Sequence, residues 1–345
     1  MNAIGRVFRF AIEAAEMVVP RFLSGVDEGV VFMLHRFPDP TLGNHAGHDT
    51  AAIRRMLGYL RRRRYDLVPL TTLFERAQKG DRLNGAVAFT IDDGYLDHAT
   101  IGAPAFAEFD CPVTTFVTTG FLDGALWFWW DKIDFVFANT RRQRVTIPMS
   151  SSDPLTYEWH TAVEREAAKA AFTWSCKFVA DPDKHVAIAH LAQAADVEIP
   201  ARAPRAYAPM SWADARRCEQ SGMTFGPHTV THPILSRATD AQSRFEIEES
   251  WKRLSSEVTR PDPVFCYPNG EPGRDFGDRE AATIASLGLR GAVVGSRGYA
   301  NGGKLRDQRD RLFVPRFPVT DIQADLIQCV TGLERLQEQI RARGR

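Results

Sequence analysis

The stretch AFTIDDGYLDH, residues 88–98, begins as an apolar strand and ends in two adjacent acids. Asp92 and Asp93 stand directly before Gly94, which permits a sharp turn. In parallel α/β folds, functional side chains gather at the C-terminal ends of strands. Neighbouring carboxylates repel each other, so a metal cation at one of them would keep it ionised and leave the second to act as a base. The stretch therefore predicts a parallel α/β fold with a metal site at the end of this strand.

Short apolar runs alternate with helical patterns along most of the chain. The expected strands cover residues 29–37, 87–93, 111–119, 222–228, 263–268 and 291–295. Helical spacing of apolar residues predicts helices between several of them, including one that Asp49 or Thr50 caps. About six or seven buried strands that alternate with helices suit either a (β/α) barrel or a doubly wound sheet.

The composition carries no charge bias. Of the 345 residues, 44% are apolar and 25% are charged, and Lys+Arg and Asp+Glu both number 43. A net charge of zero provides no overall field for nucleic acid, and the basic run 61–64 fits the solvated last turn of a helix. The five cysteines are dispersed without a Cys-x-x-Cys pair, which predicts free thiols in a reducing compartment.

Both ends of the chain are expected to form amphipathic helices. In residues 1–24, Glu13 and Glu16 interrupt the apolar stretch, which argues against a signal peptide. This helix either packs on the domain or makes weak contact with a membrane surface. We expect a cytoplasmic protein, with the inner face of the membrane as the alternative. Near the other end, Thr320 and Gln323 are expected to form a capping box that opens the last helix.

Residues 123–210 depart from the strand–helix rhythm. They open with the aromatic segment LWFWWDKIDFVF, continue with a long helical stretch and end in a proline-rich segment. We interpret this region as a helical insertion in a main domain that covers 25–345. Trp127, Trp129 and Trp130 either form the core of the insertion or stack on a sugar as part of a lid over the site.

The segment FGPHTVTHPIL, residues 225–235, supplies further metal ligands. His228 and His232 are four residues apart, so one helical turn would place both imidazoles on one face. Pro233 disfavours helical geometry for the residue before it, so we expect a tight turn at a strand end. Two imidazoles and one carboxylate, with a water completing the set, make an open coordination sphere.

Three motifs resemble those of a known family. FTIDDGY, HTVTHP and FCYPNG are similar to the first three motifs of the polysaccharide deacetylases, also called the NodB-homology or carbohydrate esterase family 4 proteins. The similarity runs from about residue 29 to residue 319, interrupted by 123–210. It implies a distorted (β/α) barrel of the NodB-homology type with a helical insertion. It also implies hydrolysis of the N-acetyl amide of amino sugars with a divalent metal, for which zinc is the expected ion.

The resemblance also implies roles for individual residues. Asp93, His228 and His232 become the metal ligands, and Asp92 becomes the general base that takes a proton from the attacking water. A backbone N–H of the third motif, in the segment with Tyr267 and Asn269, becomes a donor to the tetrahedral oxyanion.

Two departures from the family pattern concern catalysis. Cys266 stands where the third motif usually has an arginine, and Arg316 resembles an arginine of one branch of the family that pairs with an active-site carboxylate. No histidine follows His232, so the usual C-terminal histidine is missing. His35, at the end of the first strand, resembles the general acid of another branch. His45, His48 and His98 are weaker alternatives, and Tyr95 and Asp97 are expected beside the site.

We therefore expect a metal-dependent N-deacetylase that acts on a surface polysaccharide or its precursor. An O-acetyl esterase or a deformylase of a lipid-linked sugar would use the same machinery. A glycan-binding module with an impaired site, or a metal-free α/β domain with coincidental histidines, are the alternatives without an enzymatic role. An N-acetylated glycan is the expected partner, and nucleic acid is not.

Overall fold

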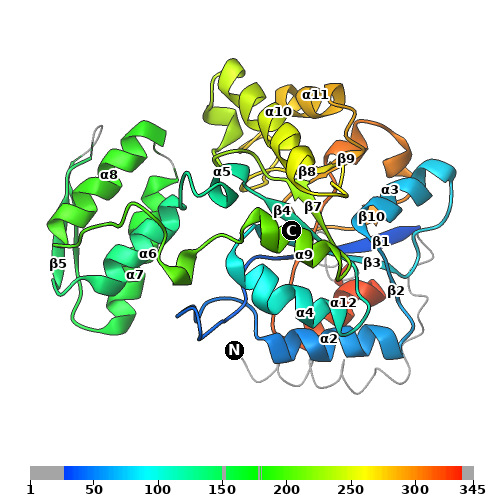
Figure 1. Cartoon of the computed structure of the whole chain (residues 1–345), viewed down its shortest axis with the longest axis horizontal. Coiled ribbons are helices and arrows are strands. Elements are labelled where there is room, and N and C mark those ends of the chain that lie inside the picture. The colour runs from blue at the N-terminus through cyan, green and yellow to red at the C-terminus, as the bar shows by residue number, and fades with distance from the viewer. Residues whose placement is uncertain (1–26, 150–152, 178, 180, 336–345) are drawn as a thin grey trace, which may run out of the picture. The chain divides into compact units, whose positions relative to one another are not determined.

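The computed structural model describes residues 27–149, 153–177, 179 and 181–335 (Figure 1). The expected N-terminal helix at 1–24 lies outside the described residues. The chain divides into two compact units, one formed by Met1–Leu122 with Met210–Arg345 and the other by Asp123–Pro209. Among the described residues, no helix has both the length and the apolar character that a membrane span requires.

A mostly parallel sheet forms the centre of the first unit. Its path runs β10 (Ala300–Asn301), β1 (Glu28–Leu34), β3 (Ala86–Asp93), β4 (Val113–Val117) and β7 (Met223–Pro227). β2 (Asp66–Leu67) pairs with β3, and β11 (Phe317–Pro318) pairs with β1. All pairings are parallel except that of β10 with β1. The central strands are buried over nearly their whole length, which is typical of parallel sheets.

The sheet curves back on itself into a distorted barrel. Asp262 N donates to Phe225 O at 2.7 Å, which links β7 to the segment that enters β8 (Val264–Cys266). β8 pairs in parallel with β9 (Gly291–Val293), and Val293 forms a bridge with Val314. The chain then reaches β11, where Phe317 pairs with Phe32 of β1. The predicted distorted (β/α) barrel is confirmed, and the C-terminal ends of its parallel strands lie on one rim.

Helices pack around the barrel between successive strands. They are α2 (Thr50–Arg62), α3 (Leu70–Lys79), the π-helical turn η1 (His98–Gly102), α4 (Ala103–Ala107), α5 (Thr119–Leu122), α9 (Trp212–Glu219), α10 (Asp240–Glu257), α11 (Asp278–Ser286) and α12 (Gln323–Thr331). The short 3-10 turns are η3 (Leu235–Arg237), η4 (Lys304–Arg306) and η5 (Asp310–Leu312). In Figure 1, α2, α4 and α12 lie beside one another on one side of this unit, and α10 lies beside α11 on another.

Local sequence explains the ends of several helices. Asp49 caps α2 by accepting a hydrogen bond from Ala51 N, which confirms one of the two expected caps. The expected capping box at Thr320 is wrong, because α12 begins after Ile322 and the Thr320 hydroxyl instead donates to Asp325. The polar residue nearest to the start of a helix is therefore not always its N-cap.

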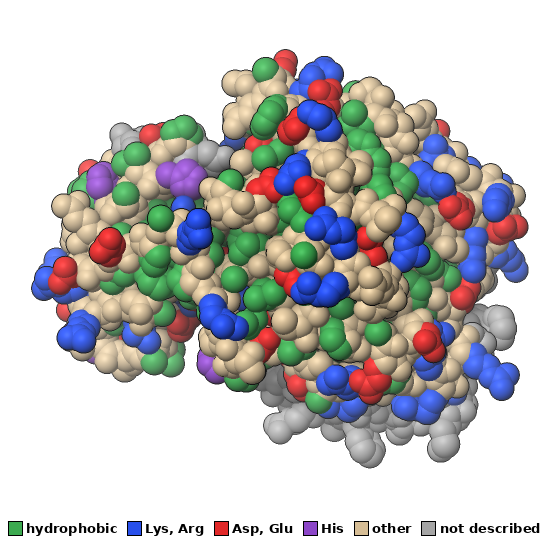
Figure 2. Space-filling view, in the orientation of Figure 1, with side chains coloured by type: hydrophobic (Ala, Val, Ile, Leu, Met, Phe, Trp, Pro, Cys, Tyr) green, Lys and Arg blue, Asp and Glu red, His purple; other side chains and the backbone are tan. Residues whose placement is uncertain are grey.

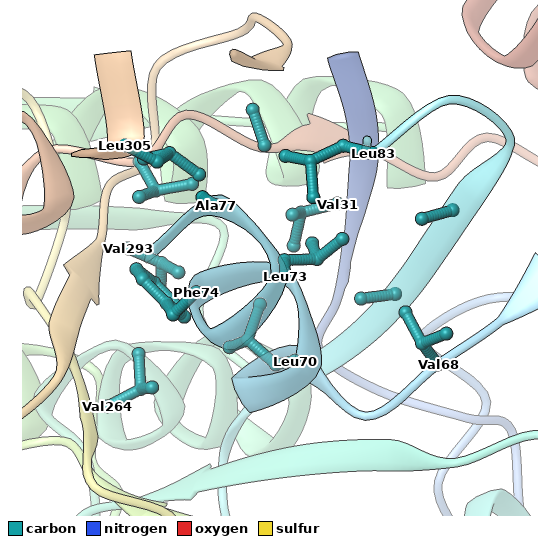
Figure 3. Close-up of a cluster of buried hydrophobic side chains, with 14 of the residues drawn as sticks. Val31, Val68, Leu70, Leu73, Phe74, Ala77, Leu83, Val264, Val293 and Leu305 are labelled. Carbon is teal, nitrogen blue, oxygen red and sulfur yellow. The ribbon is translucent and has the colours of Figure 1, made fainter. Parts of the chain in front are cut away.

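The barrel and its helix layer share an apolar core. Figure 3 shows Leu73 of α3 beside Val31 of β1 and Phe74 of α3 beside Val293 of β9. Phe74 is fully buried, and burying such a side chain contributes about 1.5–3 kcal/mol to stability. This packing holds the strands whose ends carry the acids and imidazoles.

The second unit, green in Figure 1, is mainly helical and has its own core. Its elements are α6 (Trp129–Asn139), β5 (Arg144–Ile147), β6 (Leu155–Glu158), α7 (Ala162–Cys176), α8 (Asp181–Ala194) and η2 (Arg205–Tyr207). β5 and β6 form an antiparallel hairpin, and Phe137, Phe172 and Leu191 are buried among the three helices. On the face drawn in Figure 2, basic and acidic side chains are interspersed rather than gathered by sign.

Candidate active site

Asp92 and Asp93 occupy the last two positions of β3, opposite Phe116 and Val117 of β4. Both acids are buried. The chain turns sharply after them, with a φ of 89° at Asp93 and 95° at Gly94. A Cβ at Gly94 would lie 2.6 Å from Leu122 Cδ1, so the turn needs glycine for space as well as for its backbone angle.

His228 follows β7 directly, and His232 ends a tight turn. The turn is not helical, because Thr229 and His232 have φ values of 66° and 62°. This confirms the prediction of a turn at a strand end. His228 N donates to Val117 O at 3.0 Å, which fixes the start of the turn to β4.

The two imidazoles and Asp93 converge on one point. Asp93 Oδ1 lies 3.7 Å from His228 Nε2 and 3.6 Å from His232 Nε2. With metal–ligand distances of about 2.0–2.1 Å, the ligand atoms of a tetrahedral zinc site lie about 3.3 Å apart, so the spacing fits a single cation. His228 Nδ1 lies 2.7 Å from the carbonyl oxygen of Cys266. A carbonyl only accepts, so Nδ1 carries the proton and Nε2 offers its lone pair to a metal.

Burial keeps both imidazoles neutral. It lowers the pKa of His228 to about 4, against an opposing contribution from Asp92. Burial is the main reason that the pKa of His232 lies well below its ordinary value, and the neighbouring His228 lowers that pKa further. Because only the neutral imidazole binds a metal, both rings are in the ligating form at neutral pH.

Asp92 pairs with Arg316 and lies beside His228 and Cys266, with one ligand atom of each of these three residues within 4.8 Å of the others. The guanidinium donates from Nη1 to Oδ1 at 2.7 Å and from Nη2 to Oδ2 at 2.8 Å. Arg316 is itself buried and also donates to the Thr90 hydroxyl and to Val294 O. Burial would raise the pKa of Asp92, but the charge and hydrogen bonds of Arg316 outweigh it and hold that pKa below its ordinary value. The second acid is therefore ionised through its pairing with Arg316.

Cys266 lies beside this ion pair, at the end of β8. Its Sγ is 3.6 Å from Asp92 Oδ2 and 3.2 Å from Arg316 Nη2. Burial, opposed by Arg316, raises the pKa of the thiol well above its ordinary value, so it stays neutral. The position at which the family usually has an arginine is thus filled by a small neutral side chain, and the guanidinium comes from residue 316.

His35 stands on the open side of Asp92, just beyond β1. Its Nε2 is 4.0 Å from Asp92 Oδ2, and its side chain is 49% exposed, so a bound molecule can reach it. The loop that carries it is held by residues after the Asp-Asp-Gly turn. His98 Nε2 bonds to the carbonyl oxygen of His35, and Asp97 accepts from Arg36 Nε at 2.6 Å and from Phe37 N at 3.1 Å.

The alternatives to His35 lie differently. His98 is fully buried, and burial lowers its pKa to about 3, so it holds the loop instead of meeting a ligand. His48 Nδ1 is 3.5 Å from Asp321 Oδ1. His45 is exposed. The buried Tyr95 ring lies under the Arg36 guanidinium, 3.8 Å from its centroid.

The structure places Tyr267 and Asn269, the two residues of the expected oxyanion segment, in different environments. Tyr267 does not fit the predicted role, because its side chain is buried against Phe276 and its N–H donates to Val293 O. Asn269 is exposed in a turn with a φ of 60°, and no acceptor for its N–H occurs within the described ranges. That N–H remains the predicted oxyanion donor.

The three tryptophans expected near a substrate belong to the second unit. Trp127 is buried and packs against Phe135 and Tyr207. Trp129 packs on the core of the unit, and Trp130 stacks on Phe128. Their contact with a sugar stays a prediction.

Sequence reasoning missed Glu246, a buried carboxylate on α10 that contacts the His228–His232 turn. It lies 14 residues beyond His232 in the sequence (246 − 232) within a run of acids, so no local motif marks it. Asp97 was expected beside the site, but its role in holding the His35 loop was not.

Several solved structures share the fold. The Streptococcus pyogenes deacetylase PplD in complex with acetate superimposes with a TM-score of 0.56 at 15% identity, over 88% of this chain and 99% of that one. IcaB from Ammonifex degensii gives 0.53 at 14% identity, over 88% and 97%. BC0361, a polysaccharide deacetylase from Bacillus cereus, gives 0.51 at 13% identity, over 88% and 69%. No curated protein sequence matches the chain.

The sequence model of the polysaccharide deacetylases matches residues 79–292. This range is more than half of the chain and contains both acids, both imidazoles and the third motif. His35 and Arg316 lie outside it, so their assignment depends on the geometry described above. The predicted resemblance is confirmed: this chain belongs to the polysaccharide deacetylase family.

Proposed function

We propose that this protein is a metal-dependent hydrolase that removes N-acetyl groups from amino sugars of a surface polysaccharide or its precursor. The observation that carries the proposal is the convergence of Asp93, His228 and His232 beside a separately ionised Asp92. Two neutral imidazoles and a carboxylate are the ligand types that zinc prefers at sites with an open position. The acetate bound to the related deacetylase PplD agrees with an acyl product of this size.

The residues around the site suit amide hydrolysis. A bound divalent cation supplies Lewis acidity, which lowers the pKa of water from about 16 to about 7. Asp92 accepts the proton of the attacking water on Oδ1, which keeps a lone pair beside its bond to Arg316, whereas Oδ2 accepts from both Arg316 and the Cys266 thiol. His35, exposed and 4.0 Å from Asp92, gives a proton to the departing amine. The Asn269 N–H donates to the developing oxyanion.

Zinc binding and acetate release test the proposal together. The chain is stripped of metal, titrated with zinc and assayed for acetate release from N-acetylglucosamine oligomers. We expect one equivalent of zinc, with D92N retaining zinc but losing turnover and H232A losing both. His160→Ala, an exposed histidine in the second unit, is the matched control and should behave as wild type.

The same assay separates the alternatives. Acetate release from O-acetylated sugars, without release from N-acetylated ones, would identify an esterase. Formate release from N-formylated sugars alone would identify a deformylase. Stoichiometric zinc without turnover of any of these would favour a glycan-binding module. Absence of zinc binding by the wild-type chain would refute the metal site itself.

A further inference from the structure

The turn that carries both imidazoles adopts an unfavourable backbone conformation. Thr229 and His232 both have positive φ values, 66° and 62°. Residues other than glycine rarely adopt a positive φ, and β-branched residues such as Thr229 adopt it least readily. Such a conformation persists only where its surroundings determine it, at a cost of about 1–3 kcal/mol per residue. Something outside the turn must therefore hold it.

Glu246 of α10 contacts two of the three residues between the two histidines. Its Oε2 accepts from Val230 N and from Thr231 N, both at 2.8 Å. Its Oε1 accepts from the Thr231 hydroxyl at 2.6 Å. Glu246 is 2% exposed, so these are charge-assisted hydrogen bonds in a site with little water.

The carbonyl groups of the same turn accept hydrogen bonds from α5. Thr119 N donates to Thr229 O at 3.1 Å, and Gly120 N donates to Val230 O at 2.9 Å. Within the turn, His232 N donates to the Thr229 hydroxyl at 3.0 Å. The peptide groups between the two imidazoles are thus fixed by α10 through their N–H groups and by α5 through their carbonyls.

We propose that Glu246 is a positioning residue that sets the separation of the two histidines and so the affinity of the site for a divalent cation. The inference rests on the proposed function, because that function requires a metal bound by the two histidines of the turn. Without Glu246, two partly buried N–H groups lose their acceptor and the turn relaxes from its strained conformation. The imidazoles then no longer meet Asp93 in the metal-free protein, and binding has to restore the turn.

Three substitutions separate the charge of Glu246 from its hydrogen bonds. E246A removes every contact. E246Q keeps one oxygen for both N–H groups and can donate to the Thr231 hydroxyl, so it loses the charge alone. Glu249→Ala is the matched control, because Glu249 lies on the same helix with its side chain 39% exposed and paired with Lys252.

Zinc affinity and amide exchange are measured on the full chain. Zinc affinity, by competition with a chromophoric chelator, should fall about 10–100-fold in E246A, the range expected when a group that orients metal ligands is lost. Hydrogen exchange of the Val230 and Thr231 amides in metal-free protein should quicken at least about tenfold in E246A and about tenfold in E246Q, because neutral acceptors bind less strongly. E249A should match wild type in both measurements.

The results distinguish a failure of this inference from a failure of the proposed function on which it rests. A wild-type chain that binds no zinc counts against the proposed function. A folded E246A with the zinc affinity and exchange rates of E249A overturns the role of Glu246. Should E246A fail to fold, E246Q decides, since it keeps all three contacts: amide exchange equal to that of E249A would overturn the role.

Discussion

Arg316→Met should destabilise the protein far more than a surface arginine substitution does. The guanidinium and the Asp92 carboxylate are both buried, and they are joined by hydrogen bonds of 2.7 and 2.8 Å. Removing one partner of such a pair leaves an uncompensated buried charge. We therefore expect the free energy of unfolding at neutral pH to fall by about 3–5 kcal/mol.

The pH dependence of this loss follows from the pKa of Asp92. In the native protein, Arg316 holds that pKa below the unfolded value, so the stabilisation is present above about pH 4 and is lost as pH falls. In R316M, only the smaller contributions of His35 and His228 oppose burial, so we expect the pKa of Asp92 to rise above the unfolded value. The contribution of Asp92 then reverses, and stability declines as pH rises above about 4. R316M should be closest to wild type in acid and furthest from it at pH 8.

Urea unfolding in the presence of a chelator measures the effect, because a bound cation would itself stabilise Asp92. Arg309→Met is the matched control, since Arg309 is 74% exposed and pairs with the equally exposed Asp278. The double variant D92N/R316M should recover much of the loss, because it removes both charges. The argument is wrong if R316M at pH 8 is no less stable than R309M, or if the double variant is no more stable than R316M.

Three further predictions concern His35, Asp262 and Tyr267. His35→Gln should lower kcat for acetate release by about 10²–10⁴ while zinc affinity stays unchanged, and an unchanged kcat would remove His35 as general acid. Burial raises the pKa of Asp262 to about 6, so this group stabilises the protein in acid and loses that effect as pH rises. In urea unfolding at pH 5 and pH 8, Asp262→Asn should abolish about 1 kcal/mol of this decline, and an unaltered pH slope would refute the assignment. The buried Tyr267 hydroxyl has no hydrogen-bond partner among the described residues, so Tyr267→Phe should raise stability by about 1 kcal/mol and leave acetate release unchanged. Loss of turnover would restore Tyr267 to the site.

Local patterns were sufficient for the strands and for the principal polar residues of the rim. β3 is a continuous buried run, and its end is marked by two acids before a glycine. The turn between His228 and His232 could be predicted because Pro233 disfavours helical geometry at His232, the residue before it. Arg316 and His35 could be predicted only from the family resemblance, because each meets Asp92 across more than 50 residues of sequence (92 − 35 = 57).

Side-chain alternation would have excluded Tyr267 from the site. Phe265 and Tyr267 lie in the core under α10 and α11, whereas Cys266 between them faces Asp92 and Arg316. This is the two-residue period of a strand, and it continues one residue past the end of β8. Glu246 offered no such signal, because several acids follow one another on α10 and only tertiary packing distinguishes the buried one.

The barrel explains how Asp92 is kept ionised beside a second acid. Asp92 meets the guanidinium of Arg316, and Asp93 lies 3.7 and 3.6 Å from the two imidazoles. Since the parallel strands end on one rim, any of them can deliver the positive charge that Asp92 requires. In this chain the segment before β11 delivers it, and Cys266 at the end of β8 leaves room for it. The electrostatic state of Asp92 therefore depends on the charge present at the rim, and an altered third motif is not by itself evidence of an impaired site.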